Sequence, residues 1–100
     1  MIDLAQQHLN QVRQILLASQ PTVPAYVFGS RATGKAKPFS DLDLMLKPAQ
    51  ALSWLHMCEL RQAFEESTLP MTVDAVDWNA CCDGCKQMVE PQLLALSPAL

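Results

Sequence analysis

Residues 26–46 read YVFGSRATGKAKPFSDLDLML, and the fold is predicted outward from this segment. Its first part completes a short apolar run rich in strand-forming residues, 25–28, and its last part, 41–46, begins with alternating polar and apolar residues. Both patterns are typical of strands. The polar and basic segment between them, 29–40, carries two glycines and predicts a short helical turn followed by a loop.

The turn after the first predicted strand is suited to phosphate groups. Gly29 lets the backbone turn sharply and approach a ligand closely. The N–H groups at the start of a helical turn form an anion site, and the Ser30 hydroxyl can donate to a phosphate oxygen. Arg31, Lys35 and Lys37 add positive charge nearby. This half of the segment therefore predicts phosphate binding.

The other half is suited to a metal ion. Asp41 and Asp43 are two residues apart on a predicted strand, so their side chains point to one face with Cα atoms about 6.5–7 Å apart. Leaving both carboxylates ionised is unfavourable unless a cation lies between them. Mg²⁺ typically binds one or two carboxylates together with substrate phosphates. The segment as a whole therefore predicts a metal–triphosphate site.

Residues 29–34 and 40–44 read G-S-x-x-x-G and then S-D-x-D-L, which resembles the signature of the polymerase-beta-like nucleotidyltransferase superfamily. The length resembles its minimal nucleotidyltransferase subgroup, often encoded beside a HEPN-domain protein as an antitoxin–toxin pair. The resemblance implies the superfamily's α/β (α+β) fold, with residues 1–100 as a single minimal nucleotidyltransferase domain. One departure is Thr33, where many minimal members have a second arginine.

The resemblance also implies roles for individual residues. Gly29 and Ser30 match the pair that contacts the triphosphate, and Arg31 is assigned to the nucleotide site with them, a simple surface charge being the alternative. Asp41 and Asp43 match the two metal-binding aspartates.

A third catalytic and metal-binding carboxylate is implied on a later strand. Asp74 is similar in position, and Asp77 is the competing candidate. The two point to opposite faces of a regular strand, so only one can join the site.

The reaction implied is transfer of a nucleotidyl group, AMP from ATP, to an acceptor hydroxyl, with two Mg²⁺ ions as cofactors and pyrophosphate as the second product. The implied acceptor is a tyrosine of a HEPN-type protein partner. The alternative is a non-catalytic, nucleotide-binding antitoxin that acts by stoichiometric contact. A homodimer is a further possibility for the apolar surface around the first helix.

The rest of the chain completes a small α/β domain. Apolar residues at helical spacing predict helices over 3–19 and 49–66, and a third strand is predicted over 71–78. A short helix is expected from Asn79 onward, and prolines at 91 and 98 interrupt the C-terminus. The predicted architecture is a mixed sheet of at least three strands flanked by helices.

Composition narrows the function classes. The chain has 100 residues and a formal charge of −3, which argues against stable nucleic-acid binding. Four of the seven basic residues lie within 31–47, a local basic patch that suits a small anionic ligand. No apolar run approaches the ~18–20 residues of a membrane span and no signal peptide is visible, so a soluble cytoplasmic protein is expected.

Four cysteines require a separate interpretation. Cys82 and Cys85 form a C-x-x-C pair beside Cys81, which invites a zinc or redox reading. Zinc would need two further ligands, and only His56 and Cys58 are available. Structural or incidental thiols are the simpler interpretation, because a lone C-x-x-C is a weak signal and a disulfide framework is not expected in the cytoplasm.

Overall fold

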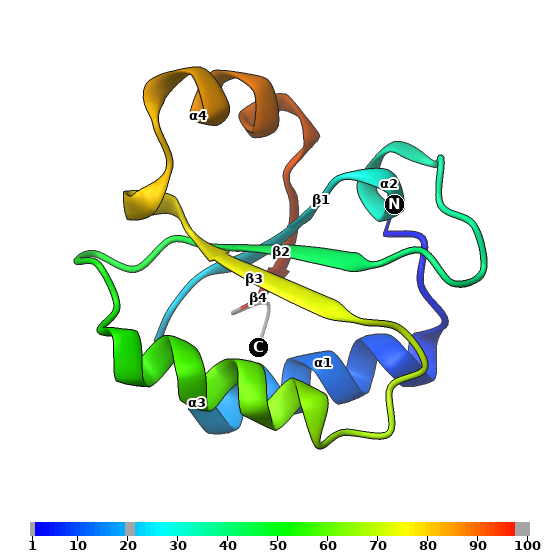
Figure 1. The fold of residues 1–100 in the computed structure, drawn as a ribbon. Coiled ribbons are helices and arrows are strands. Elements are labelled where there is room, and N and C mark those ends of the chain that lie inside the picture. Colours follow the sequence, from blue (N-terminus) through cyan, green and yellow to red (C-terminus); the bar gives the residue numbers. More distant parts are fainter. Residues whose placement is uncertain (1, 20–21, 98–100) are drawn as a thin grey trace.

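The computed structural model describes residues 2–19 and 22–97 (Figure 1). Four strands form one mixed sheet in the order β3-β2-β1-β4. The elements in chain order are α1 (Gln6–Ser19), β1 (Ala25–Phe28), α2 (Ser30–Thr33), β2 (Leu42–Leu46), α3 (Trp54–Glu65), β3 (Val73–Asp77), the 3₁₀ turn η1 (Trp78–Ala80), α4 (Asp83–Val89), the 3₁₀ turn η2 (Glu90–Gln92) and β4 (Leu94–Ser97). The expected α/β class with a mixed sheet flanked by helices is confirmed.

The sheet combines two kinds of pairing. β1 is antiparallel to both β2 and β4, whereas β2 and β3 run parallel because α3 connects them. In the β1–β2 pair Phe28 lies opposite Asp43, and in the β2–β3 pair Asp43 lies beside Asp74. The register therefore places the end of β1 and both aspartates in one row across the sheet.

One face of the sheet forms the core. α1 and α3 lie together against it (Figure 1), and alternate strand residues such as Val27, Leu44 and Ala75 are buried there. The helices contribute Val12 and Leu60, which are fully buried. The apolar faces of the helices and of the sheet thus pack together in a two-layer core.

The opposite face is covered differently. α4 stands over it at a distance from the α1–α3 layer, and α2 lies near its other end (Figure 1). Asp43 and Met45 occupy this face of β2, the first partly exposed and the second buried.

No helix within 2–19 or 22–97 combines the length and apolarity needed to cross a membrane.

Several element boundaries differ from the prediction. α1 begins at Gln6 rather than at residue 3, and the N–H of Asp3 instead fixes the segment before the helix by donating to the Arg31 carbonyl at 2.7 Å. α3 begins at Trp54 rather than at residue 49, because the Ser53 side chain caps it by accepting the His56 N–H at 3.1 Å. β2 begins at Leu42, one residue later than predicted.

β4 was not predicted. It is a four-residue strand that pairs with β1, which lies far away in the sequence. Arg13 of α1 also holds it, donating from Nε to the Leu96 carbonyl at 3.1 Å. Pro98, which was expected to break up this end of the chain, lies outside the described residues.

Candidate nucleotide and metal site

The site is built around Gly29, which links β1 to α2. Its φ of 78° and ψ of −152° belong to a backbone region that essentially only glycine adopts. A Cβ at this position would lie 2.5 Å from Oδ2 of Asp43, so this carboxylate would have to move. The backbone conformation therefore requires glycine, and the close approach of the carboxylate favours it further.

The turn after Gly29 is closed by its own carbonyl. The N–H groups of Ala32 and Thr33 donate to the Gly29 carbonyl at 3.0 and 3.1 Å, and the Thr33 hydroxyl donates to the same oxygen at 3.1 Å. Thr33 therefore stabilises the turn from within. Ser30 begins α2 and is half-buried at the start of this turn.

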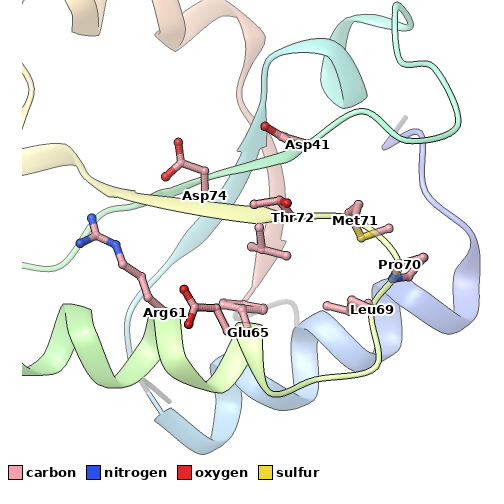
Figure 2. A pocket seen from close by; sticks show the side chains of 10 residues that line it. Asp41, Arg61, Glu65, Leu69, Pro70, Met71, Thr72 and Asp74 are labelled. Atoms are coloured by element: carbon pink, nitrogen blue, oxygen red, sulfur yellow. The ribbon is translucent and has the colours of Figure 1, made fainter.

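Three carboxylates gather beside the turn. Asp43 and Asp74 are lateral neighbours on parallel strands, and Asp41 precedes β2 by one residue. Figure 2 shows the carboxylates of Asp41 and Asp74 on the side of β3 that faces away from α3. By strand alternation Asp43 lies on this same face. The structure thus brings together residues that are more than thirty positions apart in the sequence.

The protonation of Asp43 reflects this crowding. Burial raises the pKa of the Asp43 carboxyl above its ordinary value, and the negative charges of Asp74 and Asp41 raise this pKa further. Each cause disfavours the ionised form. A bound cation would reverse the balance, because it would offset both the burial and the repulsion.

The carboxylates of Asp41, Asp43 and Asp74 fit Mg²⁺ both by their chemistry and by their positions at neighbouring strands. Hard carboxylate oxygens beside a phosphate-binding turn are the ligands that this ion takes in phosphoryl-transfer sites. Among the residues described, no group of three or more His, Cys, Asp or Glu side chains is arranged to hold an ion as they lie. Asp41 and Asp74 are exposed, so their carboxylates are free to turn about the Cα–Cβ bond.

The structure separates the two candidates for the third carboxylate. Asp74 is exposed on the site face, beside Asp43. Asp77 lies on the core face, where it is 7% exposed. Its Oδ2 accepts the Leu52 N–H at 2.8 Å and its Oδ1 accepts the Asn79 N–H at 2.9 Å. Asp77 is thus engaged in fastening the segment before α3 to the end of β3.

Arg31 is buried and bound to backbone carbonyls. It is 6% exposed, and its guanidinium donates to the carbonyls of Asp3 at 2.8 Å, Ser40 at 2.9 Å and Pro38 at 3.3 Å. The burial contradicts the alternative of a surface charge, whereas the assignment of Arg31 to the nucleotide site stays a prediction. The side chain ties the loop before β2 to the segment before α1, which positions Asp41.

The predicted basic patch is also dispersed. Lys47 lies beyond the far end of β2, where its Nζ is 4.1 Å from the Trp78 ring centroid and 5.1 Å from that of Tyr26. Lys35 and Lys37 are exposed in the loop after α2. With Arg31 buried, only these two lysines of the patch remain near the turn.

A groove of about 570 Å³ adjoins the carboxylates along the outer edge of β3. Asp41 and Asp74 line one end of it, and Arg61 and Glu65 of α3 line its wall (Figure 2). Its remaining lining comes from α3 and from the segment that leads into β3: Phe64, Leu69, Pro70, Met71, Thr72 and Val73.

The cysteines lie apart from this groove. All four are free thiols. Cys81, Cys82 and Cys85 surround the start of α4, whereas Cys58 and His56 belong to α3 on the opposite side of the sheet (Figure 1). Burial raises the pKa of the Cys81 thiol, and a hydrogen bond with the Cys85 side chain raises it further.

Sequence reasoning missed Gln92, which lies in η2. Its Oε1 accepts the N–H of Gly29 at 3.0 Å. No motif or spacing signals this contact, because it joins residues that are 63 positions apart.

This chain is similar to known proteins in sequence and in fold. The polymerase beta nucleotidyltransferase family matches residues 10–93. The probable protein adenylyltransferase MntA of Haemophilus influenzae is 36% identical over 88 residues, covering 88% of this chain and 77% of the relative. A chain in the crystal structure of a toxin–antitoxin with AMP-PNP has a TM-score of 0.74 and 29% identity, covering 88% of this chain and 71% of that chain. A chain in the complex of tri-AMPylated Shewanella oneidensis HEPN toxin with MNT antitoxin has a TM-score of 0.69 and 26% identity, covering 91% and 70%.

Proposed function

Because this chain belongs to the polymerase beta nucleotidyltransferase family, we propose that it transfers AMP from ATP to a hydroxyl group of a HEPN-type protein partner in a Mg²⁺-dependent reaction. The observation that carries the proposal is the position of Asp43 and Asp74, side by side on neighbouring strands and adjacent to the Gly29 turn. The relatives supply the substrate and partner, since one is named an adenylyltransferase and another is bound to an AMPylated HEPN toxin.

The turn binds the triphosphate. Gly29 allows the backbone to lie close to Asp43, and Ser30 offers its hydroxyl to a phosphate oxygen at the start of α2. Asp41, Asp43 and Asp74 would hold the metal. When bound there, Mg²⁺ supplies charge neutralisation for the triphosphate and for the departing pyrophosphate.

The chemical step is an in-line displacement at the α-phosphorus. The acceptor oxygen forms a bond to the α-phosphorus, and the bond from that phosphorus to the bridging oxygen of the β-phosphate breaks. Pyrophosphate leaves and AMP stays on the acceptor. Asp74 takes the proton of the acceptor hydroxyl, a role that its exposure and its place at the mouth of the groove support.

The groove beside β3 supports entry of the acceptor from the partner. It reaches the carboxylates from the side away from the Gly29 turn, so acceptor and triphosphate approach Asp43 from different directions. Its mixed lining of apolar side chains with Arg61 and Glu65 suits a protein side chain better than a polyanion.

The test is incubation of the purified protein with ATP labelled at the α-phosphate, Mg²⁺ and a HEPN-domain protein. The expected result is a labelled HEPN band that disappears with EDTA and falls on the order of 10²–10³-fold in rate for Asp43→Asn. Asp83→Asn, the same change at an exposed position on α4, is the matched control and should label normally.

One outcome of this experiment would contradict the proposed AMP transfer. If the wild-type protein binds Mg²⁺ and ATP and neutralises the HEPN protein while no label is transferred, the catalytic proposal is wrong. The protein would then act as a nucleotide-binding antitoxin by stoichiometric contact. Neutralisation that survives Asp43→Asn would support the same conclusion.

A further inference from the structure

Gln92 contacts the residue at the centre of the nucleotide site. Its side-chain oxygen, Oε1, lies 3.0 Å from the backbone nitrogen of Gly29. Gln92 belongs to η2, which follows α4 and precedes β4. The contact therefore brings the C-terminal part of the chain to the phosphate-binding turn.

The surroundings of Gly29 place this amide beside the residue around which the site is built. Oδ2 of Asp43 occupies the position next to the Gly29 α-carbon, and Gln92 occupies the position next to its nitrogen. The carboxylate that is proposed to hold the metal and the Gln92 amide thus flank one residue. A triphosphate bound at this turn and to a metal on Asp43 would lie within reach of both.

The hydrogen bond determines which atoms of the Gln92 amide can still bind a ligand. The Gly29 N–H occupies the oxygen, so the Nε2 group retains both of its donor hydrogens. Three other glutamines, Gln6, Gln11 and Gln62, donate from Nε2 to side-chain oxygens. Within residues 2–19 and 22–97, no protein acceptor pairs with Nε2 of Gln92.

We propose that Gln92 is a nucleotide-binding residue whose Nε2 donates to an oxygen of the triphosphate. The inference rests on the proposed function, because it uses the same phosphate-binding turn. With Gln92 in place the Gly29 N–H is already satisfied, so the amide replaces one backbone donor by a side-chain donor directed at the same ligand. Gly29 in turn holds the amide in the orientation that presents donors rather than an acceptor to the phosphate.

The competing role for Gln92 is a structural tie that holds η2 against the turn without touching the ligand. Two substitutions separate the roles. Gln92→Glu keeps an oxygen that can accept the Gly29 N–H but replaces the NH₂ donor with a negative oxygen. Gln92→Leu removes both the acceptor and the donors while keeping a similar size.

The experiment is titration calorimetry of the whole protein with Mg²⁺ and AMP-PNP, ADP or AMP. For AMP-PNP we expect the dissociation constant to rise about tenfold for Gln92→Leu and by at least as much for Gln92→Glu. The factor should shrink from AMP-PNP to AMP, because fewer phosphate oxygens remain to meet the donor. Gln87→Glu adds the same charge at an exposed position on α4 and should bind like wild type.

The outcomes distinguish the inference from the proposed function. A structural tie predicts that Gln92→Glu binds AMP-PNP like wild type while Gln92→Leu binds more weakly, and this pattern would overturn the inference. An equal loss for all three nucleotides would also overturn it. If wild type fails to bind any nucleotide, the proposed function itself fails. Thermal unfolding of each variant without nucleotide confirms that the comparison is made between folded proteins.

Discussion

Along β2, Leu42, Leu44 and Leu46 point into the core and are fully buried, whereas Asp43 points to the opposite face and is only partly covered. The α1–α3 face is thus filled by apolar side chains. The opposite face brings like charges together, and burial and repulsion both raise the pKa of Asp43. One strand therefore contributes apolar residues to the core from one face and carries the proposed metal ligand Asp43 on the other. The core beneath β2 thus holds the proposed site in place.

The largest expected effect lies on the core face. Leu44→Ala should reduce the free energy of unfolding by about 2–5 kcal/mol, because Leu44 is fully buried and its removal leaves a cavity. Urea unfolding followed by circular dichroism measures the change. Met88→Ala is the control, since Met88 is 68% exposed, and a loss of similar size there would contradict the assignment of stability to the core face.

The next effect lies at the turn that joins the two faces. Gly29→Ala should cost roughly 1–3 kcal/mol and also displace Asp43, because φ is 78° and the added methyl group would meet the carboxylate. Gly34→Ala is the control: Gly34 has the same φ but a ψ of 16°, which lies in the less strained left-handed helical region, and open space around the added atom. Both variants should unfold more easily, but only Gly29→Ala should lose nucleotide binding. Equal binding losses in the two would show that strain alone, rather than contact with Asp43, controls the site.

A smaller effect separates the two aspartates of β3. Asp77→Ala should lower the free energy of unfolding by about 1–2 kcal/mol, because it leaves the N–H of Leu52 without its acceptor. Asp74→Ala should change stability by less than about 0.5 kcal/mol while reducing AMP transfer. Urea unfolding and the labelling assay together distinguish the structural role of Asp77 from the catalytic role proposed for Asp74. Normal labelling by Asp74→Ala would refute its assignment as the third carboxylate.

The smallest effect concerns the charge on the site face. Because the pKa of Asp43 is raised in the folded protein, ionisation opposes folding, and this loss of stability develops as pH rises through the raised pKa. Asp43→Asn cannot ionise and should therefore raise the Tm at neutral pH. The gain should vanish below the ordinary pKa of an aspartate, where both proteins are neutral at this position. A Tm lower than that of wild type at pH 7 would contradict this prediction.

Much of the fold follows from local patterns. The patterns over residues 3–19, 49–66 and 71–78 predicted the right elements, which the structure places at 6–19, 54–65 and 73–77. β4 escaped prediction because four residues between turn formers carry no distinctive period, and only pairing with β1 makes them a strand. The short helix expected from Asn79 is present as α4, but it begins at Asp83 after η1.

The site was predictable where its chemistry is local. The spacing of Asp41 and Asp43 and the glycine after β1 are sequence features, and the structure places Asp43 against Gly29. The contacts of Arg31 were not predictable because its partners are backbone carbonyls, which every residue carries and no sequence motif indicates. The predicted basic patch failed for a related reason, since β2 carries Lys47 to the opposite end of the sheet from the turn.

The strand–turn–strand unit and the kind of ligand that it suits follow from the sequence alone, because covalent spacing orients side chains two residues apart on a strand. Which aspartate of β3 lies beside Asp43 depends on the tertiary structure. Asp74 and Asp77 are the same residue type on the same strand. Only the packing of α3 beneath β3 buries Asp77 and leaves Asp74 on the site face. The tertiary structure also brings Gln92 to Gly29, because that contact depends on how α4 and η2 return the chain to the turn.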